Sequence, residues 1–336
     1  MPSRREFVGG ALSGATSAAL QLAASKVSAQ TASSVDTVQN DEDIDRLLPK
    51  LSNWGRWGPD DQLGTLNFLT PATRLGAAKL IRSGRIVPLA REMPVANTPG
   101  VRRQVYELMR YQDEPPEEAG CIDLIGMIYH GFTITHIDAL CHIFTPAGRQ
   151  GMYNGFPISA VTPHGAEKLG IEVMGAAGIV GRGALLDIAA LKGGALDLGS
   201  AIMPADLMAA EAAQKITVGE GDILFVRNGA GARNVLQHGT GLHASCLPWL
   251  HERKVAVLSS DCDSDVHPAP AGFSRWSEPI HMIALPYLGL PLLDNTELEV
   301  LSIACREEGR WEFFVSVAPW RFKGATSSPV NPLALF

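Results

Sequence analysis

The 336-residue sequence has no long run of charge of one sign, and this absence excludes two classes of partner. Its 28 basic and 35 acidic residues give a formal net charge of −7, and its densest acidic segment is the short DEPPEE at 113–118. Nucleic acids and anionic membrane surfaces bind basic patches, so neither is an expected partner. The 46% content of hydrophobic residues is typical of a globular protein that buries a sizeable core.

Several signatures of catalysis and cofactor binding are also missing. The sequence contains no GxSxG nucleophile elbow and no phosphate-binding P-loop, and the GAGARN segment at 229–234 lacks the third glycine of a dinucleotide-binding turn. The cysteines form no CxxC pair, so we expect buried small side chains rather than disulfides or thiolate zinc ligands. They are Cys121, Cys141, Cys246, Cys262 and Cys305.

The first thirty residues differ in character from the rest. They combine a charged start, a Gly/Ala-rich middle of weak hydrophobicity and small residues near Ala29, which predicts a signal peptide at 1–30. The SRREF segment at 3–7 resembles a twin-arginine motif, so we expect the twin-arginine export machinery as a partner and a periplasmic or secreted location. An N-terminal membrane anchor is the alternative. No other segment has 18 uncharged apolar residues, so no membrane association is expected after cleavage.

The remaining chain predicts a polar leader followed by one domain. Residues 31–50 are rich in Ser, Thr, Asp and Gln and are expected to be a flexible leader. A helix is predicted from Thr70 as N-cap and Pro71 as first residue to a stop at Gly84. Predicted helices alternate with strands only in the second half, which favours a single mixed α/β domain over 51–336.

One short stretch, YHGFTITHIDALCHIF at 129–144, carries the strongest chemical signal. Within a strand His136 and Asp138 point to the same face, with Cα atoms about 6–7 Å apart, so both can reach one ion. Imidazole and carboxylate donors suit zinc or manganese. His142 follows a predicted break and approaches without being bound to the metal, as a general base would. The alternative is a pair of ordinary polar residues at a strand end.

A second candidate segment is EPIHMIALPYLGLPLLDNTELEVLS at 278–302. His281 and Asp294 lie there among apolar residues, where unpaired polar groups are costly. Thr296 and Glu299 have the spacing of a capping box, which places Asp294 just before a helix. Asp294 is therefore either a ligand or a simple cap residue. The DCDSD run at 261–265 follows a predicted strand as a polar loop.

The chain resembles the cyclase or kynurenine-formamidase-like metal-dependent hydrolases, a family that includes isatin hydrolases. TITHIDALCH matches the T-H-x-D-x-x-x-H part of the signature HxGTHxDxPxH. Further segments look like the longer-chain branch of the family, and together they span nearly the whole mature chain: NWGRWGPDDQLGTLNFLTP at 53–71, GMYNGFP at 151–157, GDILFVRNG at 221–229 and LLDNTELEVL at 292–301. The resemblance implies a swivelling β/β/α fold with a barrel-like β core and flanking helices, and a homodimer or homotetramer.

The resemblance also implies a set of site residues. His136, Asp138, His281 and Asp294 would bind one Mn²⁺ or Zn²⁺, and His142 would be the base. The chain departs from the signature at Phe132, where a ligand histidine is expected, at Leu140, where proline is expected, and at Asp294, where glutamate is usual. His130 shares the strand face of His136, but six residues of straight strand span about 20 Å. His130 would therefore reach the ion only across a bulge or bend.

The activity implied is hydrolysis of a C–N bond in a small cyclic amide or arylformamide. A divalent ion lowers the pKa of a bound water and polarises the carbonyl, while an imidazole takes the proton. The tentative substrate-pocket residues are Trp54, Trp57, Phe132 and Arg227, although the tryptophans also suit a surface or interface and Arg227 a structural ion pair. The alternatives are a metal-dependent lyase or dehydratase on the same scaffold and a non-catalytic periplasmic binding protein.

Overall fold

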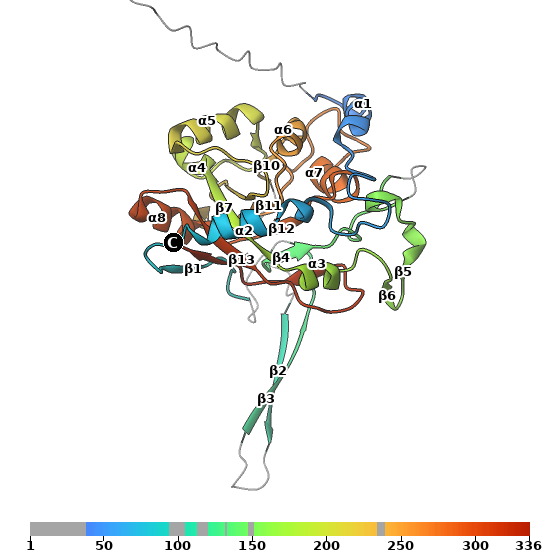
Figure 1. The fold of residues 1–336 in the computed structure, drawn as a ribbon, viewed down its shortest axis with the longest axis horizontal. Coiled ribbons are helices and arrows are strands. Elements are labelled where there is room, and N and C mark those ends of the chain that lie inside the picture. The colour runs from blue at the N-terminus through green and yellow to red at the C-terminus, as the bar shows by residue number, and fades with distance from the viewer. Residues whose placement is uncertain (1–37, 94–104, 113–119, 132, 147–150, 234–238) are drawn as a thin grey trace, which may run out of the picture. The chain divides into compact units, whose positions relative to one another are not determined.

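Apolar strands from the second half of the chain form the centre of a nine-stranded mixed sheet. The computed structural model describes residues 38–93, 105–112, 120–131, 133–146, 151–233 and 239–336, so the predicted signal at 1–30 and residues 31–37 lie outside the described residues. The strand order is β1-β15-β13-β7-β9-β11-β12-β4-β14. The sheet curls into a half-barrel with helices around it (Figure 1), which confirms the predicted single mixed α/β domain.

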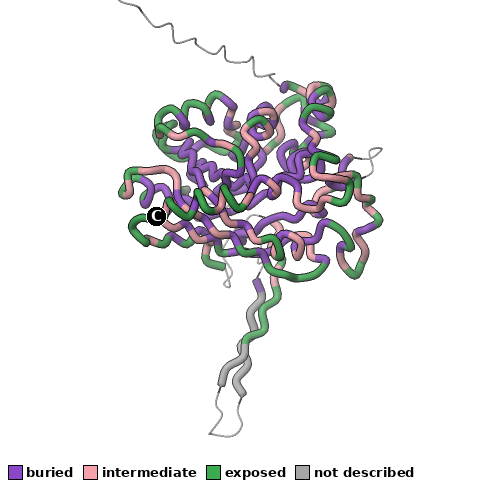
Figure 2. The backbone as a smooth tube through the Cα atoms, in the orientation of Figure 1, coloured by how far each residue is buried: buried purple, intermediate pink, exposed green. Residues whose placement is uncertain are grey.

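Four neighbouring strands at the centre of the sheet run parallel to one another. They are β7 (Ile179–Asp187), β9 (Ile223–Arg227), β11 (Val257–Ser260) and β12 (Leu292–Asp294). All five residues of β9 are buried, as expected for a parallel strand covered on both faces. Figure 2 shows buried backbone concentrated along these strands and exposed backbone on the outer helices.

Antiparallel strands flank the parallel centre on both sides. On one side lie β13 (Glu312–Val317), β15 (Leu333–Leu335) and β1 (Ile86–Pro88), and on the other lie β4 (His136–Asp138) and β14 (Ser327–Pro329). Three two-stranded ladders complete the described strands: β2 (Val105–Gln112) with β3 (Gly120–Met127), β5 (Val161–Thr162) with β6 (Gly165–Ala166), and β8 (Ala201–Ile202) with β10 (Gly241–Leu242). Residues 121–138 are therefore divided between the two strands β3 and β4.

The helices pack around the sheet and in the connections between strands. They are α1 (Asp41–Leu51), α2 (Pro71–Ala78), α3 (Ile171–Ala177), α4 (Ile188–Leu191), α5 (Pro204–Gln214), α6 (Cys246–Glu252), α7 (Pro279–Ile283) and α8 (Leu298–Glu308). Helices α2 and α5 pack on β7, and α8 packs on β9 and β1. Within the residues described, no helix is long and apolar enough to cross a bilayer. The four cysteines with described side chains are buried free thiols.

Three local predictions need correction. Residues 41–50, predicted as flexible leader, belong to helix α1, because Ile44, Leu47 and Leu48 bury an apolar face that the polar composition of the segment conceals. Helix α2 begins at Pro71 with Thr70 as N-cap, as predicted, but ends at Ala78 rather than near Gly84.

The predicted capping box before α8 is also wrong. The N-cap is Glu297, whose carboxylate accepts the N–H of Glu299. Thr296 instead donates its hydroxyl to the carbonyl of Ser260 on the neighbouring strand. A contact across the sheet therefore uses the side chain that the local spacing assigned to the cap.

One glycine holds the 3₁₀ helix at 64–68 against the rest of the domain. Gly64 has a φ of +58°, and a Cβ at this position would collide with the carbonyl oxygen of Gly289. The same carbonyl accepts the N–H of Thr65 at 2.8 Å. Only a residue without a side chain combines this backbone conformation with so close an approach.

Candidate metal centre

Strand β4 brings His136 and Asp138 to the same face, as their spacing predicts. The ladder between β4 and β12 pairs His136 directly with Asp294. Side chains of directly opposed residues project to the same side of a sheet, so the register adds Asp294 to the pair. All three residues are buried. The local sequence predicts the first pair, and strand pairing supplies the third member.

Imidazole nitrogens of four histidines surround the carboxylate of Asp138. Oδ1 lies 3.3 Å from Nδ1 of His130 and 3.7 Å from Nε2 of His136. Oδ2 lies 3.9 Å from Nε2 of His142 and 3.8 Å from Nε2 of His281. Charge-assisted N–H···O bonds are about 2.7–2.9 Å long, so all four distances are longer than a close bond of this kind. Oδ1 is buried and accepts no hydrogen bond from the described residues.

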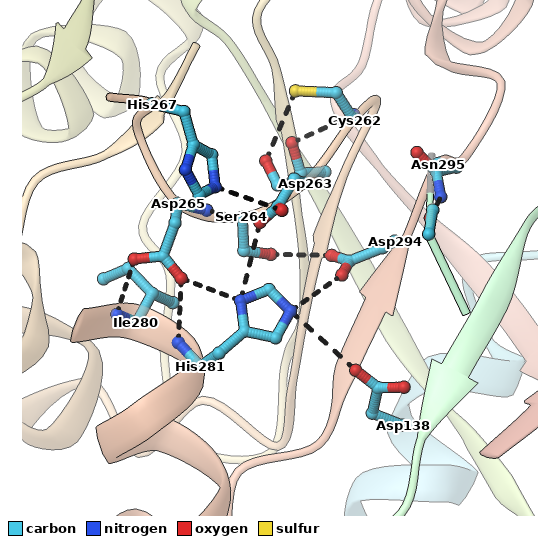
Figure 3. A network of polar contacts seen from close by, with 12 residues as sticks. Asp138, Cys262, Asp263, Ser264, Asp265, His267, Ile280, His281, Asp294 and Asn295 are labelled. Carbon is cyan, nitrogen blue, oxygen red and sulfur yellow. Dashed lines mark hydrogen bonds and ion pairs between the residues drawn. The ribbon is translucent and has the colours of Figure 1, made fainter. Parts of the chain in front are cut away.

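His281 connects β4 to the loop that follows β11 (Figure 3). Its Nδ1 lies 2.7 Å from Oδ2 of Asp265, and its Nε2 lies 3.2 Å from Oδ2 of Asp294. Ser264 donates its hydroxyl to the other oxygen of Asp294 at 2.8 Å. The carboxylate of Asp265 also accepts the backbone N–H groups of Ile280 and His281, which holds the start of α7. Asp265 thereby orients the imidazole and leaves Nε2 facing Asp138 and Asp294.

The DCDSD loop, a polar loop after a strand as predicted, contributes carboxylates to the centre. Asp263 lies 3.5 Å from Nδ1 of His281 and 3.2 Å from Nε2 of His267. The residues of this loop follow β11 at the carboxyl end of a parallel strand, which is where ligand sites of open α/β sheets form. That position is a signal that could have identified Asp263 and Asp265, but it requires the strand order.

Burial and the charges of neighbouring side chains change the pKa values of three groups in the centre. Burial acts to raise the pKa of Asp138, but the nearby imidazoles, His142 foremost, outweigh it and lower the pKa. Burial lowers the pKa of His142 to about 4. Burial also acts to lower the pKa of His281, but Asp263, Asp265 and Asp294 raise it well above its usual value. The centre is therefore a buried set of carboxylates balanced by imidazoles.

The donors fit a divalent cation. Three groups have ligand atoms within 4.8 Å of one another: His130 with Asp138 and His142, His136 with Asp138 and Asp294, and Asp263 with His281 and Asp294. Two donors bound to one ion at about 2.0–2.2 Å lie roughly 3.3–3.6 Å apart at a tetrahedral angle. The contacts of Asp138 are close to this spacing. Imidazole and carboxylate donors without thiolate suit zinc or manganese.

The structure brings His130 to the centre, although six residues of straight strand would have kept it far from His136. β3 ends at Met127 and β4 begins at His136, and Gly131 between them has a φ of +117°. The chain therefore bends where a continuous strand would have carried His130 away from Asp138. Phe132 lies outside the described residues.

The tentative pocket residues make contacts elsewhere. Trp54 stacks on Tyr287 with ring centroids 5.8 Å apart, and its indole N–H donates to the carbonyl of Pro286 at 2.6 Å. Trp57 packs edge-on against Phe68. Trp54 and Tyr287 line an apolar pocket of about 390 Å³ whose lining includes none of the histidines or aspartates of the centre.

Arg227 forms the structural ion pair that was its alternative interpretation. It pairs with Asp187 at 2.5 Å and with Glu299 through two hydrogen bonds of 3.0 and 2.6 Å. Asp187 ends β7 and Glu299 belongs to α8, so Arg227 ties this helix to the sheet. Its guanidinium is occupied by these two carboxylates, which argues against a role in holding substrate.

The protein thus has a curled α/β sheet with a candidate divalent-metal centre of histidine and aspartate donors. Residues 79–264 match a family model described as "Putative cyclase". A crystal structure of a novel cyclase is 32% identical, with 85% of this chain and 100% of that chain covered and a TM-score of 0.74. The chain belongs to the Cyclase family, as the motifs indicated.

Two isatin hydrolase structures show a weaker likeness. Isatin hydrolase A from Ralstonia solanacearum is 18% identical, with 79% of this chain and 95% of that chain covered and a TM-score of 0.48. An isatin hydrolase bound to the product analogue thioisatinate is 17% identical, with coverages of 78% and 96% and a TM-score of 0.49. No curated protein sequence matches the chain.

Proposed function

We propose that this protein is a metal-dependent hydrolase that cleaves a C–N bond of a small cyclic amide or arylformamide. The observation that carries the proposal is the buried carboxylate of Asp138, with four imidazole nitrogens at 3.3–3.9 Å. A buried carboxylate oxygen that accepts no hydrogen bond from the described residues, such as Oδ1 of Asp138, is costly unless a cation satisfies it. The C–N bond and the substrate class are inferred from the THxDxxxH motif of the family signature.

His136, Asp138, His281 and Asp294 would hold Mn²⁺ or Zn²⁺. Metal-binding histidines usually donate their second ring N–H to a protein acceptor, which fixes the tautomer. Nδ1 of His136 lies 2.8 Å from the carbonyl of Ile134, and Nδ1 of His281 lies 2.7 Å from Asp265. With Nδ1 held in this way, both rings turn Nε2 toward Asp138. The bound cation would lower the pKa of a coordinated water and polarise the substrate carbonyl.

His142 differs from these two histidines and is our candidate for the base. Its Nε2 faces Asp138 at 3.9 Å, and no hydrogen bond from the described residues engages its other nitrogen. Its side chain is 26% exposed, so solvent reaches the ring. In the proposed reaction Nε2 takes a proton from the attacking water and returns it to the leaving nitrogen as the C–N bond breaks. A ring nitrogen that no described residue holds suits this exchange.

The test combines metal analysis with a substrate panel. Protein folded in cells supplied with Mn²⁺ or Zn²⁺ is analysed for bound metal and assayed with formamides, lactams of the isatin type and lactones. We expect about one equivalent of metal or more and C–N hydrolysis. His142→Ala should retain the metal and lose hydrolysis by about 10²–10⁴-fold. The exposed His164→Ala is the matched control and should leave both unchanged.

Two outcomes would contradict the proposed hydrolase, and a third would contradict only the role of His142. Wild-type protein with less than about a tenth of an equivalent of metal would favour a non-catalytic binding protein. Proton exchange or elimination at a substrate carbon, without C–N hydrolysis, would favour a lyase. Equal hydrolysis by the wild type and His142→Ala would remove His142 as the base.

A further inference from the structure

His130 has no counterpart in the matching part of the family signature, yet the fold places it in the centre. It lies three residues beyond the end of β3 and six residues before His136. The bend at Gly131, with a φ of +117°, directs the ring back toward β4. Nδ1 of His130 then lies 3.3 Å from Oδ1 of Asp138, the shortest of the four imidazole contacts with this carboxylate.

The orientation of the His130 ring is determined from its far side. Its Nε2 lies 3.1 Å from the hydroxyl of Thr326, which directly precedes β14. The ring also stacks on His142, with centroids 4.0 Å apart and an angle of 18° between the planes. Thr326 and His142 together fix both the tilt and the rotation of the imidazole. With Nε2 at the hydroxyl, Nδ1 is the nitrogen that faces Asp138.

The 3.3 Å separation of Nδ1 of His130 and Oδ1 of Asp138 fits two ligands of one ion. A protonated imidazole that donates to a buried carboxylate would close to about 2.7–2.9 Å. Two donors about 2.0 Å from a common ion lie roughly 3.3 Å apart at a tetrahedral angle. Oδ1 of Asp138 is buried and accepts no hydrogen bond from the described residues. The contact therefore has the spacing expected around a cation.

We propose that His130 is a metal ligand that acts together with Asp138 and supplies the imidazole missing at position 132. The ligand atoms of His130, Asp138 and His142 all lie within 4.8 Å of one another, so His142 faces the same cation position. His130 resembles His136 and His281 in having its second ring nitrogen held by a partner, whereas no described residue holds that of His142. His130 thus belongs with the ligands, and His142 keeps the role of base. This inference rests on the proposed metal-dependent function.

Metal affinity of purified protein tests the proposal without relying on catalysis. Chelator-stripped wild type, His130→Ala, Thr326→Val and His164→Ala are titrated with Mn²⁺ and with Zn²⁺ against a chromophoric chelator. We expect His130→Ala to lower the affinity by about 100-fold or more. Thr326→Val removes only the partner of Nε2 and should lower it about 10- to 100-fold. His164→Ala, an exposed histidine, should leave it unchanged.

A spectroscopic readout separates loss of a ligand from loss of the fold. With Co²⁺ in place of the native ion, the visible absorption bands should change in His130→Ala and remain as in the wild type in His142→Ala. Thermal unfolding of the metal-free proteins should be the same for all variants, because the side chain of His130 is 28% exposed. If His130→Ala is nonetheless unstable, the affinity of Thr326→Val decides.

The outcomes distinguish this inference from the proposed function. Affinity of His130→Ala within about threefold of the wild type, with an unchanged Co²⁺ spectrum, would overturn the role of His130 and leave the hydrolase proposal standing. Absence of metal from the wild type would overturn both. Loss of metal from both His130→Ala and His142→Ala would retain His130 as a ligand and reassign His142 from base to ligand.

Discussion

Replacing Asp41 with asparagine should destabilise the fold where α1 meets the segment before α7. Asp41 is the first residue of α1, and its carboxylate is the acceptor for the segment that leads into α7. Oδ2 accepts the N–H and the hydroxyl of Ser274 at 3.2 and 2.9 Å and the N–H of Arg275 at 2.9 Å. Oδ1 accepts the N–H of Trp276 at 3.2 Å. The same segment carries His281 five residues further on.

The size of the loss in stability depends on which hydrogen bonds of the carboxylate an amide can keep. The best orientation of the introduced amide places its oxygen where Oδ2 stood and turns its NH₂ group toward the N–H of Trp276. A buried N–H left without an acceptor costs about 1–3 kcal/mol. The three remaining bonds change from charge-assisted to neutral, and each loses about 0.5 kcal/mol or more. We therefore expect Asp41→Asn to lower the free energy of unfolding by about 3 kcal/mol at pH 7.

The effect should depend on pH in a defined direction. Burial acts to raise the pKa of Asp41, but the hydrogen bonds from Arg275, Trp276 and Ser274 outweigh it and lower the pKa. A carboxyl with a lowered folded-state pKa stabilises the fold above its unfolded pKa, and this contribution is lost as the pH falls through the folded value. The difference between wild type and variant should therefore be full at pH 7 and shrink below about pH 4.

Urea unfolding followed by circular dichroism at a series of pH values measures this difference. Asp60→Asn, on an exposed carboxylate, is the matched control and should change the free energy of unfolding by less than about 0.5 kcal/mol. A difference below about 0.5 kcal/mol for Asp41→Asn at pH 7 would refute the hydrogen-bond reasoning. A difference that grows as the pH falls below about 4 would refute the sign of the linkage.

Three further predictions concern the glycine contact, the buried ion pair and the metal. Gly64→Ala should cost about 3 kcal/mol or more in urea unfolding, and Gly55→Ala, whose added methyl meets nothing within 4 Å, only about 1 kcal/mol; equal costs would contradict the collision. Arg227→Met should cost about 3–5 kcal/mol and leave metal content unchanged, whereas Lys192→Met breaks a more exposed pair worth at most about 1 kcal/mol. Mn²⁺ or Zn²⁺ at about 100 times its dissociation constant should stabilise the wild type by about 2.7 kcal/mol in thermal unfolding, and Asp138→Asn should abolish this response. The same melting curve for the wild type with EDTA and with metal would count against a folded-state metal site.

Local sequence signals predicted elements whose ends are set by short-range chemistry. Thr70 and Pro71 start α2 as predicted, and β9 is one of the strands in the second half of the chain, where helices and strands were predicted to alternate. These predictions succeeded because caps and buried strands depend on neighbouring residues. The prediction for residues 41–50 failed because the polar composition of α1 hides a buried apolar face. The capping box at Thr296 failed because the neighbouring strand offered its hydroxyl another acceptor.

The candidate site was predictable in its donors and less so in its geometry. The spacing of His136 and Asp138 places both on one face of β4 from the alternation of any strand. The proximity of His130 to Asp138 was not expected, because a parity argument assumes a straight chain and the backbone bends at Gly131. Export through the twin-arginine machinery and assembly into a homodimer or homotetramer remain predictions.

The sequence by itself determined the donor types, the strand face that carries His136 and Asp138, and the family to which the chain belongs. Those features depend on residue identity and on separations of a few positions. Only the tertiary structure decided that Asp294 stands opposite His136, because strand register joins segments that are far apart in the sequence. It also decided that Asp265 orients His281, and that His130 turns back to Asp138 with Thr326 behind it. A metal centre needs donors within a few ångströms of one point, and packing of the whole chain sets that distance.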